Sequence, residues 1–378
     1  HSIDHNLLKL DILGHDDPTM IRMLQDLTGR DPLTIPLDGK DVMSLFQNTE
    51  ALGITPEQIG GTRLGCLGIP EFGTDFAMAM VIEAQPKSFS DLVRISGLSH
   101  GTNVWVGNAQ DLIRDGIATI STCVCTRDDI MTYLINKGVE PEKSFKIMEA
   151  VRKGMVAKGK TPAEQWKAWK EDMTAHDVPD WYIKSCEKIE YMFPKAHAAA
   201  YVMMAWRIGY CKIHYPLAYY GAFFSIRAKA FSYALMCRGQ AHMEAIMKEY
   251  KRRMDAVANK EVGAEPLSNK EELAYGDMRV VQEMYARGYE FEPIDIFRAQ
   301  SRSFQIVGDK LMPSLSSIDG LGEKAADAIV EAAKDGPFLS KDDFRERTRV
   351  SKNIVDMIAE LGLLGDLPES NQLSLFDL

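Results

Sequence analysis

The sequence predicts a mainly α-helical fold with a small β contribution, of the α+β class. Residues 136–225 carry apolar side chains at three- and four-residue spacing, and the amphipathic stretches 241–256 and 278–288 repeat this helical pattern. Two short apolar runs within residues 303–312 flank a Gly-Asp pair, which is typical of a β-hairpin with a tight turn. A chain of 378 residues is long enough for two or three domains with cores of their own.

The composition is that of an ordinary soluble globular protein, with 46% hydrophobic and 26% charged residues. No apolar run is long enough to span a bilayer and the first residues are no signal peptide, so we expect a cytoplasmic location and no membrane partner. The chain lacks an initiating Met, and we therefore expect a fragment. Of six cysteines only Cys123 and Cys125 lie close together, a weak zinc signal, and reduced thiols are the simpler interpretation.

The chain begins with a predicted strand that carries one acid. Residues 7–14 form a short apolar run that contains Asp11 and ends at a glycine. A carboxylate in a buried strand is costly unless it binds a cation or a paired group. Asp11 is therefore a candidate metal ligand, and the alternative is an acid that is partly exposed or salt-bridged.

The next stretch is rich in loops with short helices. Residues 44–53 predict a capped helix that ends at a glycine, residues 65–73 a tight connector, and Ser90 begins another helix. The end of that helix, residues 95–102, combines hydroxyls with backbone amides that could cradle phosphate or sugar. The alternative is a Gly-Ser turn without a ligand.

Arg127 begins a further helix whose first turn is rich in acids, and its guanidinium could reach a triphosphate. Pro194 then opens a run of strong helix formers, as a proline in the first helical turn should. Lys195, His197 and Tyr201 share the start of this helix, with the last two four residues apart on one side. Because a helix N-terminus favours phosphate oxygens, this is a candidate nucleotide-binding face. The alternative is a buried amphipathic helix that the Lys and His only cap and solvate.

The overall net charge of −10 argues against a uniformly cationic nucleic-acid binder, but residues 143–170 hold eight basic residues against two acids. This excess of +6 includes Lys153 and Lys158 and predicts a local phosphate contact, with a solvated helical face as the alternative. Within it, residues 156–171 predict a charged hairpin.

Residues 318–329 carry the glycine pair, alanines and apolar positions of a helix-hairpin-helix. Gly320 and Gly322 permit positive backbone angles, so that amides at the helix start, beside Lys324, could grip a phosphate without reading bases. A plain packing motif is the alternative. A second, weaker unit is predicted over residues 344–364.

The chain ends in residues 372–376, Gln-Leu-Ser-Leu-Phe, after a polar, turn-rich stretch. A frayed terminus is the ordinary expectation. Gln372, Leu373, Leu375 and Phe376 are nevertheless hard to explain in an exposed tail without a partner.

Several of these motifs match one family. Phe-Pro-Lys-Ala-His-Ala-Ala-Ala-Tyr, residues 193–201, resembles the fingers helix of the bacterial C-family replicative DNA polymerases, in the variant of the PolC-type DNA polymerase III alpha subunits. Residues 95–102 resemble the PolC fingers segment beside the incoming nucleotide, and residues 7–14 resemble the palm strand that supplies the third catalytic aspartate. Residues 372–376 resemble the bacterial sliding-clamp-binding motif.

The resemblance implies a fragment of a multidomain polymerase that begins at the end of a polymerase-beta-like palm. The domains expected from it are the palm end with its catalytic strand (1–28), the fingers (29–225), a helical connecting region on the clamp side (226–305), a duplex-DNA-binding helix-hairpin-helix region (306–366) and a clamp-binding tail (367–378).

The implied activity is template-directed DNA synthesis, in which a deoxynucleotide is transferred to a primer 3′ end with Mg²⁺ by a two-metal mechanism. In this reading Asp11 is catalytic and binds metal, and Phe193, Ser96, Ser99 and His100 join the nucleotide site. The implied partners are primer–template DNA, a deoxynucleoside triphosphate, the sliding clamp and other replisome subunits. Only ten residues precede Asp11 and none forms the family's Asp-x-Asp motif, so the alternative is a non-catalytic, clamp-tethered DNA-binding adaptor.

Overall fold

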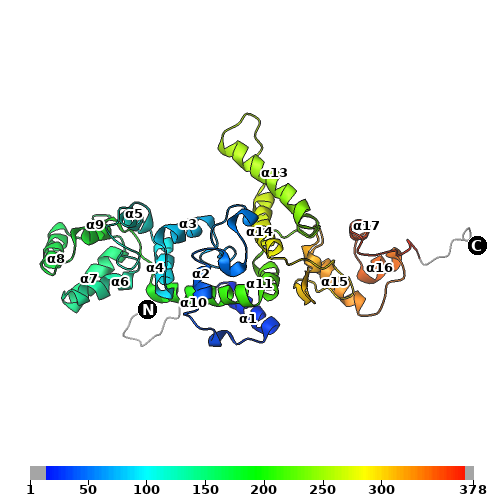
Figure 1. The fold of residues 1–378 in the computed structure, drawn as a ribbon, viewed down its shortest axis with the longest axis horizontal. Coiled ribbons are helices and arrows are strands. Elements are labelled where there is room, and N and C mark those ends of the chain that lie inside the picture. The colour runs from blue at the N-terminus through cyan, green and yellow to red at the C-terminus, as the bar shows by residue number, and fades with distance from the viewer. Residues whose placement is uncertain (1–13, 371–378) are drawn as a thin grey trace, which may run out of the picture.

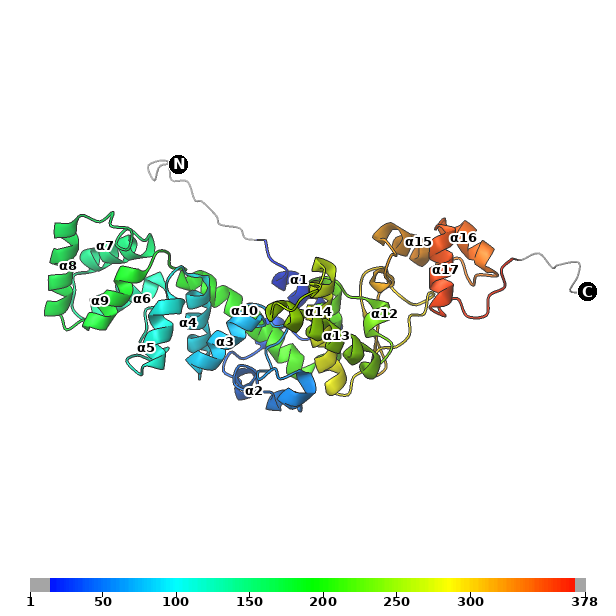
Figure 2. The ribbon, with the colours of Figure 1, turned by 90° about the horizontal axis from the view of Figure 1, so that it is seen from above.

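The computed structural model describes residues 14–370 and has the expected fold class, mainly α-helical with one two-stranded sheet in this range. The molecule is elongated, with α10 along its long axis (Figures 1 and 2). The helices are α1 (Asp17–Thr28), α2 (Lys40–Ser44), α3 (Asp75–Ala84), α4 (Phe89–His100), α5 (Gln110–Arg114), α6 (Arg127–Asn136), α7 (Pro141–Arg152), α8 (Ala163–Ala175), α9 (Asp180–Lys188), α10 (Lys195–His214), α11 (Pro216–Ala222), α12 (Tyr233–Met236), α13 (Gln240–Ala258), α14 (Asn269–Ala286), α15 (Glu323–Ala333), α16 (Lys341–Thr348) and α17 (Lys352–Glu360). Shorter helical turns are η2 (Pro32–Thr34), η3 (Glu50–Leu52), η4 (Pro56–Ile59), η5 (Trp105–Ala109), η6 (Phe223–Arg227) and η7 (Leu315–Ser317), and the strands are β1 (Gln305–Val307) and β2 (Lys310–Met312).

Helix α10 is the centre of the larger of two hydrophobic cores. It contacts α1, α2, α4, α6 and α11. Trp206 is buried and donates its indole N–H to the carbonyl of Pro36, 2.8 Å away. Gly209 lets the segment around α2 approach closely, because a Cβ at this position would lie 3.2 Å from the side chain of Leu45. The lack of a side chain at Gly209 therefore sets how closely this segment packs against α10.

A fully buried ion pair ties α10 to α14. Lys212 Nζ lies 2.8 Å from Glu283 Oε1, and neither side chain is exposed to solvent. The ammonium also donates to the carbonyls of Gly65 and Leu67, at 2.8 and 2.6 Å, and the hydroxyl of Tyr220 donates to Glu283 at 2.8 Å. Burial lowers the pKa of Lys212, and the nearby carboxylate opposes this shift.

The smaller core lies at the end of the molecule that holds α15, α16 and α17 (Figure 1). It joins the three helices to Tyr233, Ile294 and Ile296 from the preceding chain. The predicted hairpin is confirmed: β1 and β2 pair antiparallel, with Gln305 opposite Met312, and Gly308 takes φ +63° at the turn. At the opposite end α6, α7, α8 and α9 form a helical lobe, and α13 projects sideways from the body (Figure 1).

Two predictions about helices were wrong, and a third agrees with the structure to within a residue at the helix start. Residues 44–53 do not form one helix, because α2 ends at Ser44 and the Asn48 side chain accepts the N–H of Glu50, which competes with helical bonding. Residues 156–171 are not a hairpin, since α8 runs through most of them. The helix expected from Ser90 begins at Phe89, and the segment 95–102 that was predicted to end it is helical through His100.

Candidate functional site

A row of aromatic rings joins three segments that are far apart in the sequence. The ring centroids of His100 and Phe193 lie 4.7 Å apart, those of Phe193 and His197 5.9 Å, those of His197 and Tyr201 6.5 Å, and those of Tyr201 and His15 5.2 Å. We call these five residues the aromatic row. Four of them were predicted as site residues, and the structure brings them together.

Backbone contacts hold the aromatic row in place. Thr102, just after α4, forms an isolated antiparallel bridge with Tyr191, just before α10, with its N–H 2.9 Å from the Tyr191 carbonyl. The N–H of Arg127 donates to the carbonyl of Phe193 at 3.4 Å. The ends of α4 and α6 are therefore fixed against the start of α10.

Two acids of α6 contact the N-terminal end of α10. Asp128 accepts the backbone N–H of Lys195 at 2.8 Å, and Asp129 lies 3.0 Å from the Lys195 ammonium. Arg127 is farther from Asp128, with Nε 3.8 Å from the carboxylate. Lys195 and Arg127 both remain more than one-third exposed. A phosphate arriving here would meet two accessible cations and would compete with the two carboxylates for them.

Glu71 connects the end of α4 to this site. Its Oε2 lies 2.6 Å from His100 Nε2 and 3.4 Å from the hydroxyl of Ser96, which is itself buried. The hydrogen bond to Glu71 raises the pKa of His100, which keeps the imidazole protonated to higher pH. Ser99 donates to the carbonyl of Ser96 at 2.9 Å. Because α4 continues through His100, a cradle of loop amides at residues 95–100 does not form; side chains face the site instead.

His100, Ser99, Glu71 and His15 line one wall of a cavity of about 560 Å³. Arg227 lies in the same lining and pairs with buried Asp17 at 2.7 Å. The cavity opens beside the aromatic row. Its lining combines imidazole, hydroxyl and guanidinium donors, which could bind a phosphorylated ligand, with the carboxylates of Glu71, Glu272 and Asp277.

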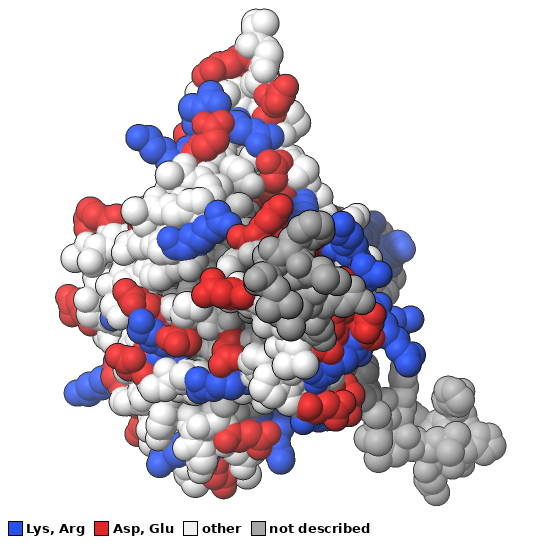
Figure 3. Space-filling view, turned by 90° about the vertical axis from the view of Figure 1, so that its right-hand side faces the viewer, with Lys and Arg blue, Asp and Glu red and all other residues white. Residues whose placement is uncertain are grey.

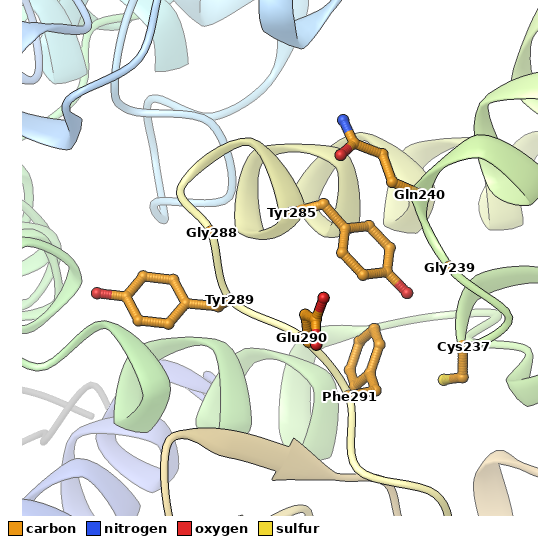
Figure 4. Close-up of a pocket in the computed structure, with 8 residues that line it drawn as sticks. All are labelled: Cys237, Gly239, Gln240, Tyr285, Gly288, Tyr289, Glu290 and Phe291. Atoms are coloured by element: carbon orange, nitrogen blue, oxygen red, sulfur yellow. The ribbon is translucent and has the colours of Figure 1, made fainter.

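A second cavity, of about 270 Å³, is lined by Tyr285, Glu290 and Phe291 together with the turn around Gly239 (Figure 4). It lies where α14 ends and α13 begins, and none of the predicted site residues lines it. It has no part in the candidate site.

The basic excess of residues 143–170 is largely paired within the fold. Lys153 Nζ lies 2.8 Å from Glu149, and Lys158 Nζ lies 3.4 Å from Glu190. Other lysines of this stretch reach acids that lie outside it, including Glu142, Asp172 and Glu187. The local charge counted along the sequence thus overstates the field that the folded surface presents.

The first helix-hairpin-helix turn is partly as predicted. Gly320 takes φ +85°, but Gly322 has φ −70° and is the N-cap of α15, so the expectation of two positive angles was wrong for Gly322. No atom lies within 4 Å of where a Gly322 Cβ would stand, and Lys324 is exposed beside it. The start of α15 is open to a large ligand.

The second hairpin repeats the geometry of the first. Arg349 takes φ +57° where the first turn has Gly320, and Ser351 caps α17 with φ −69° and ψ 158°, matching −70° and 157° at Gly322. Between these positions Val350 is buried, like Leu321. The molecule seen from this end shows acidic and basic side chains interspersed rather than one basic field (Figure 3). Contact with a phosphate backbone would therefore depend on local amides.

Asp11 and the tail residues Gln372, Leu373, Leu375 and Phe376 lie outside the described residues. Within residues 14–370 no group of three or more His, Cys, Asp or Glu side chains is arranged to hold a metal ion, so these residues by themselves do not fit a two-metal site. Cys123 and Cys125 are buried free thiols. No helix in the described range combines the length and apolarity needed to cross a membrane.

Sequence reasoning missed Glu71, His15 and the pairing roles of Asp128 and Asp129. The acid-rich first turn of α6 was a visible signal for the two aspartates. Glu71 takes φ +68°, which a glutamate rarely does, and nothing in its sequence neighbourhood predicts this angle or its contact with His100.

Known proteins similar to this chain match it along its whole length. A model described as the bacterial DNA polymerase III alpha subunit finger domain matches residues 17–177, and one described as a helix-hairpin-helix motif matches residues 288–373. The chain is 54% identical over 377 residues to a DNA polymerase III PolC-type of Streptococcus pneumoniae serotype 2 (strain D39 / NCTC 7466), and 52% identical to one of Streptococcus pyogenes. Each match takes in 100% of this chain and 25% of the relative, so the chain spans about a quarter of the length of these curated relatives. With both family models and this identity throughout, the whole chain is similar to a segment of the PolC-type DNA polymerase III proteins.

Proposed function

We propose that this chain is the part of a template-directed DNA polymerase that binds the incoming deoxynucleoside triphosphate and the primer–template duplex. The observation that carries the proposal is the convergence of His100, Phe193, His197 and Tyr201 in the aromatic row, beside Lys195. Flat rings suit a nucleobase and the accessible cations suit its phosphates. The relatives named as DNA polymerase III PolC-type support the same assignment.

In this proposal the triphosphate and the base of the nucleotide would each contact their own set of residues. Lys195 and Arg127 would bind the triphosphate after exchanging their carboxylate partners, while Phe193 and Tyr201 would bound the space for the base. Ser96 is buried, so its part would be indirect, through Glu71. Ser99 and His100 line the adjoining cavity and could donate to phosphate oxygens.

Duplex DNA would lie against the two hairpins. The open start of α15 at Gly322 and the repeated turn at Ser351 would each offer backbone amides to one phosphate strand, with Lys324 adding a cation. Lys153 and Lys158 could contribute only by leaving their present carboxylate partners. We also propose that the palm end, fingers, connecting region, helix-hairpin-helix region and tail meet at residues 28, 225, 305 and 366.

The metal chemistry requires groups outside residues 14–370. Asp11 would be one ligand of Mg²⁺, since a carboxylate is a suitable ligand for a hard divalent cation, and further acids would come from elsewhere in the polymerase. The tail around Leu375 and Phe376 would bind the sliding clamp.

The test uses the full-length polymerase that carries this segment, in single-turnover primer extension. Asp11→Asn should abolish nucleotide addition while primer–template binding persists, because a neutral amide is a poor Mg²⁺ ligand. Lys195→Ala and His197→Ala should each weaken nucleotide binding by roughly 10-fold or more, the size of one charge-assisted hydrogen bond. Lys184→Ala is the matched control, since Lys184 lies on α9, away from the proposed face, and likewise pairs with an exposed carboxylate, that of Asp180 on the same helix. Normal nucleotide binding in both variants would exclude the proposed face.

An adaptor without catalysis is the second candidate, favoured by the lack of a metal-binding group within the described residues. It predicts that Asp11→Asn leaves nucleotide addition unchanged.

A further inference from the structure

The most unusual backbone position beside the site is Glu71. It lies in the connector between η4 and α3 and takes φ +68°, in the left-handed region that costs a residue with a Cβ about 1 kcal/mol or more. The side chain is only 9% exposed, although a glutamate ordinarily lies in solvent. A strained backbone and a buried charge persist together only where the surrounding structure requires them.

The carboxylate of Glu71 is committed to the end of α4. It lies 2.6 Å from His100 Nε2 and accepts the Ser96 hydroxyl at 3.4 Å. The imidazole ring also packs against the ring of Phe193, with centroids 4.7 Å apart. His100 is thus held between a carboxylate and an aromatic ring, while its side chain remains 41% exposed.

This arrangement leaves one nitrogen for a ligand. With Nε2 bonded to Glu71, His100 Nδ1 has no hydrogen-bond partner in the part of the chain that the structure describes. The neutral ring that donates Nε2–H to Glu71 presents Nδ1 as an acceptor, whereas the imidazolium presents an N–H donor there. Only the imidazolium is suited to a phosphate oxygen.

We propose that Glu71 is a positioning residue for nucleotide binding: it holds His100 against Phe193 so that Nδ1–H donates to a phosphate oxygen of the incoming triphosphate. The inference rests on the proposed function and adds a residue that the aromatic row does not contain. Glu71 acts through His100 and does not touch the nucleotide itself.

Glu71 and burial act in opposite directions on the pKa of His100: the carboxylate raises it and burial lowers it. Besides Glu71, the titratable and charged groups that line the cavity are His15, Arg227, Lys229, Glu272, Asp277 and Arg279. The hydrogen bond to Glu71 is the largest influence on His100 and raises its pKa, so loss of the carboxylate should return the pKa toward the ordinary value near 6.5. The effect on nucleotide binding should then depend on pH.

The experiment measures the apparent Kd for the incoming nucleotide and the maximal incorporation rate separately, in the full-length polymerase. Glu71→Gln should raise the Kd about tenfold near pH 7 and leave the maximal rate within about twofold, because one charge-assisted contact is lost. Near pH 6 a larger fraction of His100 is protonated in the variant than near pH 7, so the Kd of the variant should move toward the wild-type value. His100→Gln should raise the Kd at both pH values, and the double variant should be no worse than His100→Gln.

A matched control exists on the same scaffold. Asp41 Oδ2 lies 2.6 Å from His214 Nε2, at the opposite end of α10 and away from the cavity lining. Asp41→Asn breaks an equivalent carboxylate–histidine pair and should leave the nucleotide Kd unchanged at both pH values.

If Glu71→Gln does not fold, Glu71→Gly serves in its place, because glycine accepts the positive φ and removes the carboxylate. An unchanged Kd in the folded Glu71 variant, with a raised Kd in Lys195→Ala, would overturn the positioning role and leave the proposed function standing. Unchanged values in both would overturn the proposed function. A raised Kd that does not recover near pH 6 would show that Glu71 acts through packing, which also overturns the inference.

Discussion

Two lysines on the same helix should lose very different amounts of stability on the same substitution. Lys212→Met removes an ammonium that is fully buried and leaves the Glu283 carboxylate with the Tyr220 hydroxyl as its remaining partner in the buried network described above. It also removes the donor of two buried carbonyls. Breaking one side of a buried pair costs about 3–5 kcal/mol, because an uncompensated charge stays in the interior. Lys195→Met breaks a pair whose lysine is 42% exposed and should cost less than about 1 kcal/mol.

The assay is urea unfolding of the 378-residue chain followed by far-ultraviolet circular dichroism. The Lys212 variant should lose about 3–5 kcal/mol of unfolding free energy, and the Lys195 variant should lie within about 1 kcal/mol of wild type. Adding Glu283→Gln to Lys212→Met should restore part of the loss, because the buried charge is then gone while an oxygen remains for Tyr220. A Lys212 variant as stable as the Lys195 variant would refute the argument that this network holds α10 to α14.

Three further outcomes are expected. Burial raises the pKa of Asp277 to about 6, so between pH 4 and 6 the folded protein keeps a proton that the unfolded chain loses. The free energy of unfolding of the wild type, relative to that of Asp277→Asn, should therefore fall by up to about 3 kcal/mol between pH 4 and 7. A difference that does not change with pH in urea titrations would contradict this. A Cβ at Gly322 would have no atom within 4 Å, and the position has a negative φ, so Gly322→Val should fold normally yet weaken duplex binding about equally for all sequences. Sequence-selective loss in binding titrations would count against backbone contact. Leu375→Ala with Phe376→Ala should shorten clamp-stimulated products on a long primed template and leave clamp-free synthesis unchanged, and equal product lengths would return the tail to a frayed terminus.

Local sequence signals were sufficient where the structure is local. The helix after Pro194, the hairpin around Gly308 and the turn at Gly320 all follow from residue preferences that act within a few positions. The faces of α10 could be predicted for the same reason, since side chains four residues apart share a side. Lys195, His197 and Tyr201 accordingly lie as their spacing indicates.

Contacts between distant segments could not be predicted from residue patterns. Glu71 and His100 are 29 positions apart, and their contact depends on a left-handed backbone angle that the residue type disfavours. Lys158 was counted as a free cation, but its partner Glu190 lies beyond the basic stretch and reaches it only through folding. The charge summed along a stretch of sequence therefore predicts the charge of the folded surface only where neighbours in the chain are also neighbours in space.

The lysines at the two ends of α10 differ in whether their ammonium groups can exchange one partner for another. At the Lys212 end every hydrogen-bonding position of the ammonium is filled by groups within the core, so replacing a partner leaves an unsatisfied charge. At the Lys195 end the partners are aspartates of α6 near the surface, and a phosphate could take their place at little cost in free energy because solvent already screens the pair. Lys195 and Lys212 are about 26 Å apart at 1.5 Å per residue. A rigid core at one end and exchangeable carboxylates at the other would allow the same helix to hold the fold fixed while the proposed nucleotide enters and leaves.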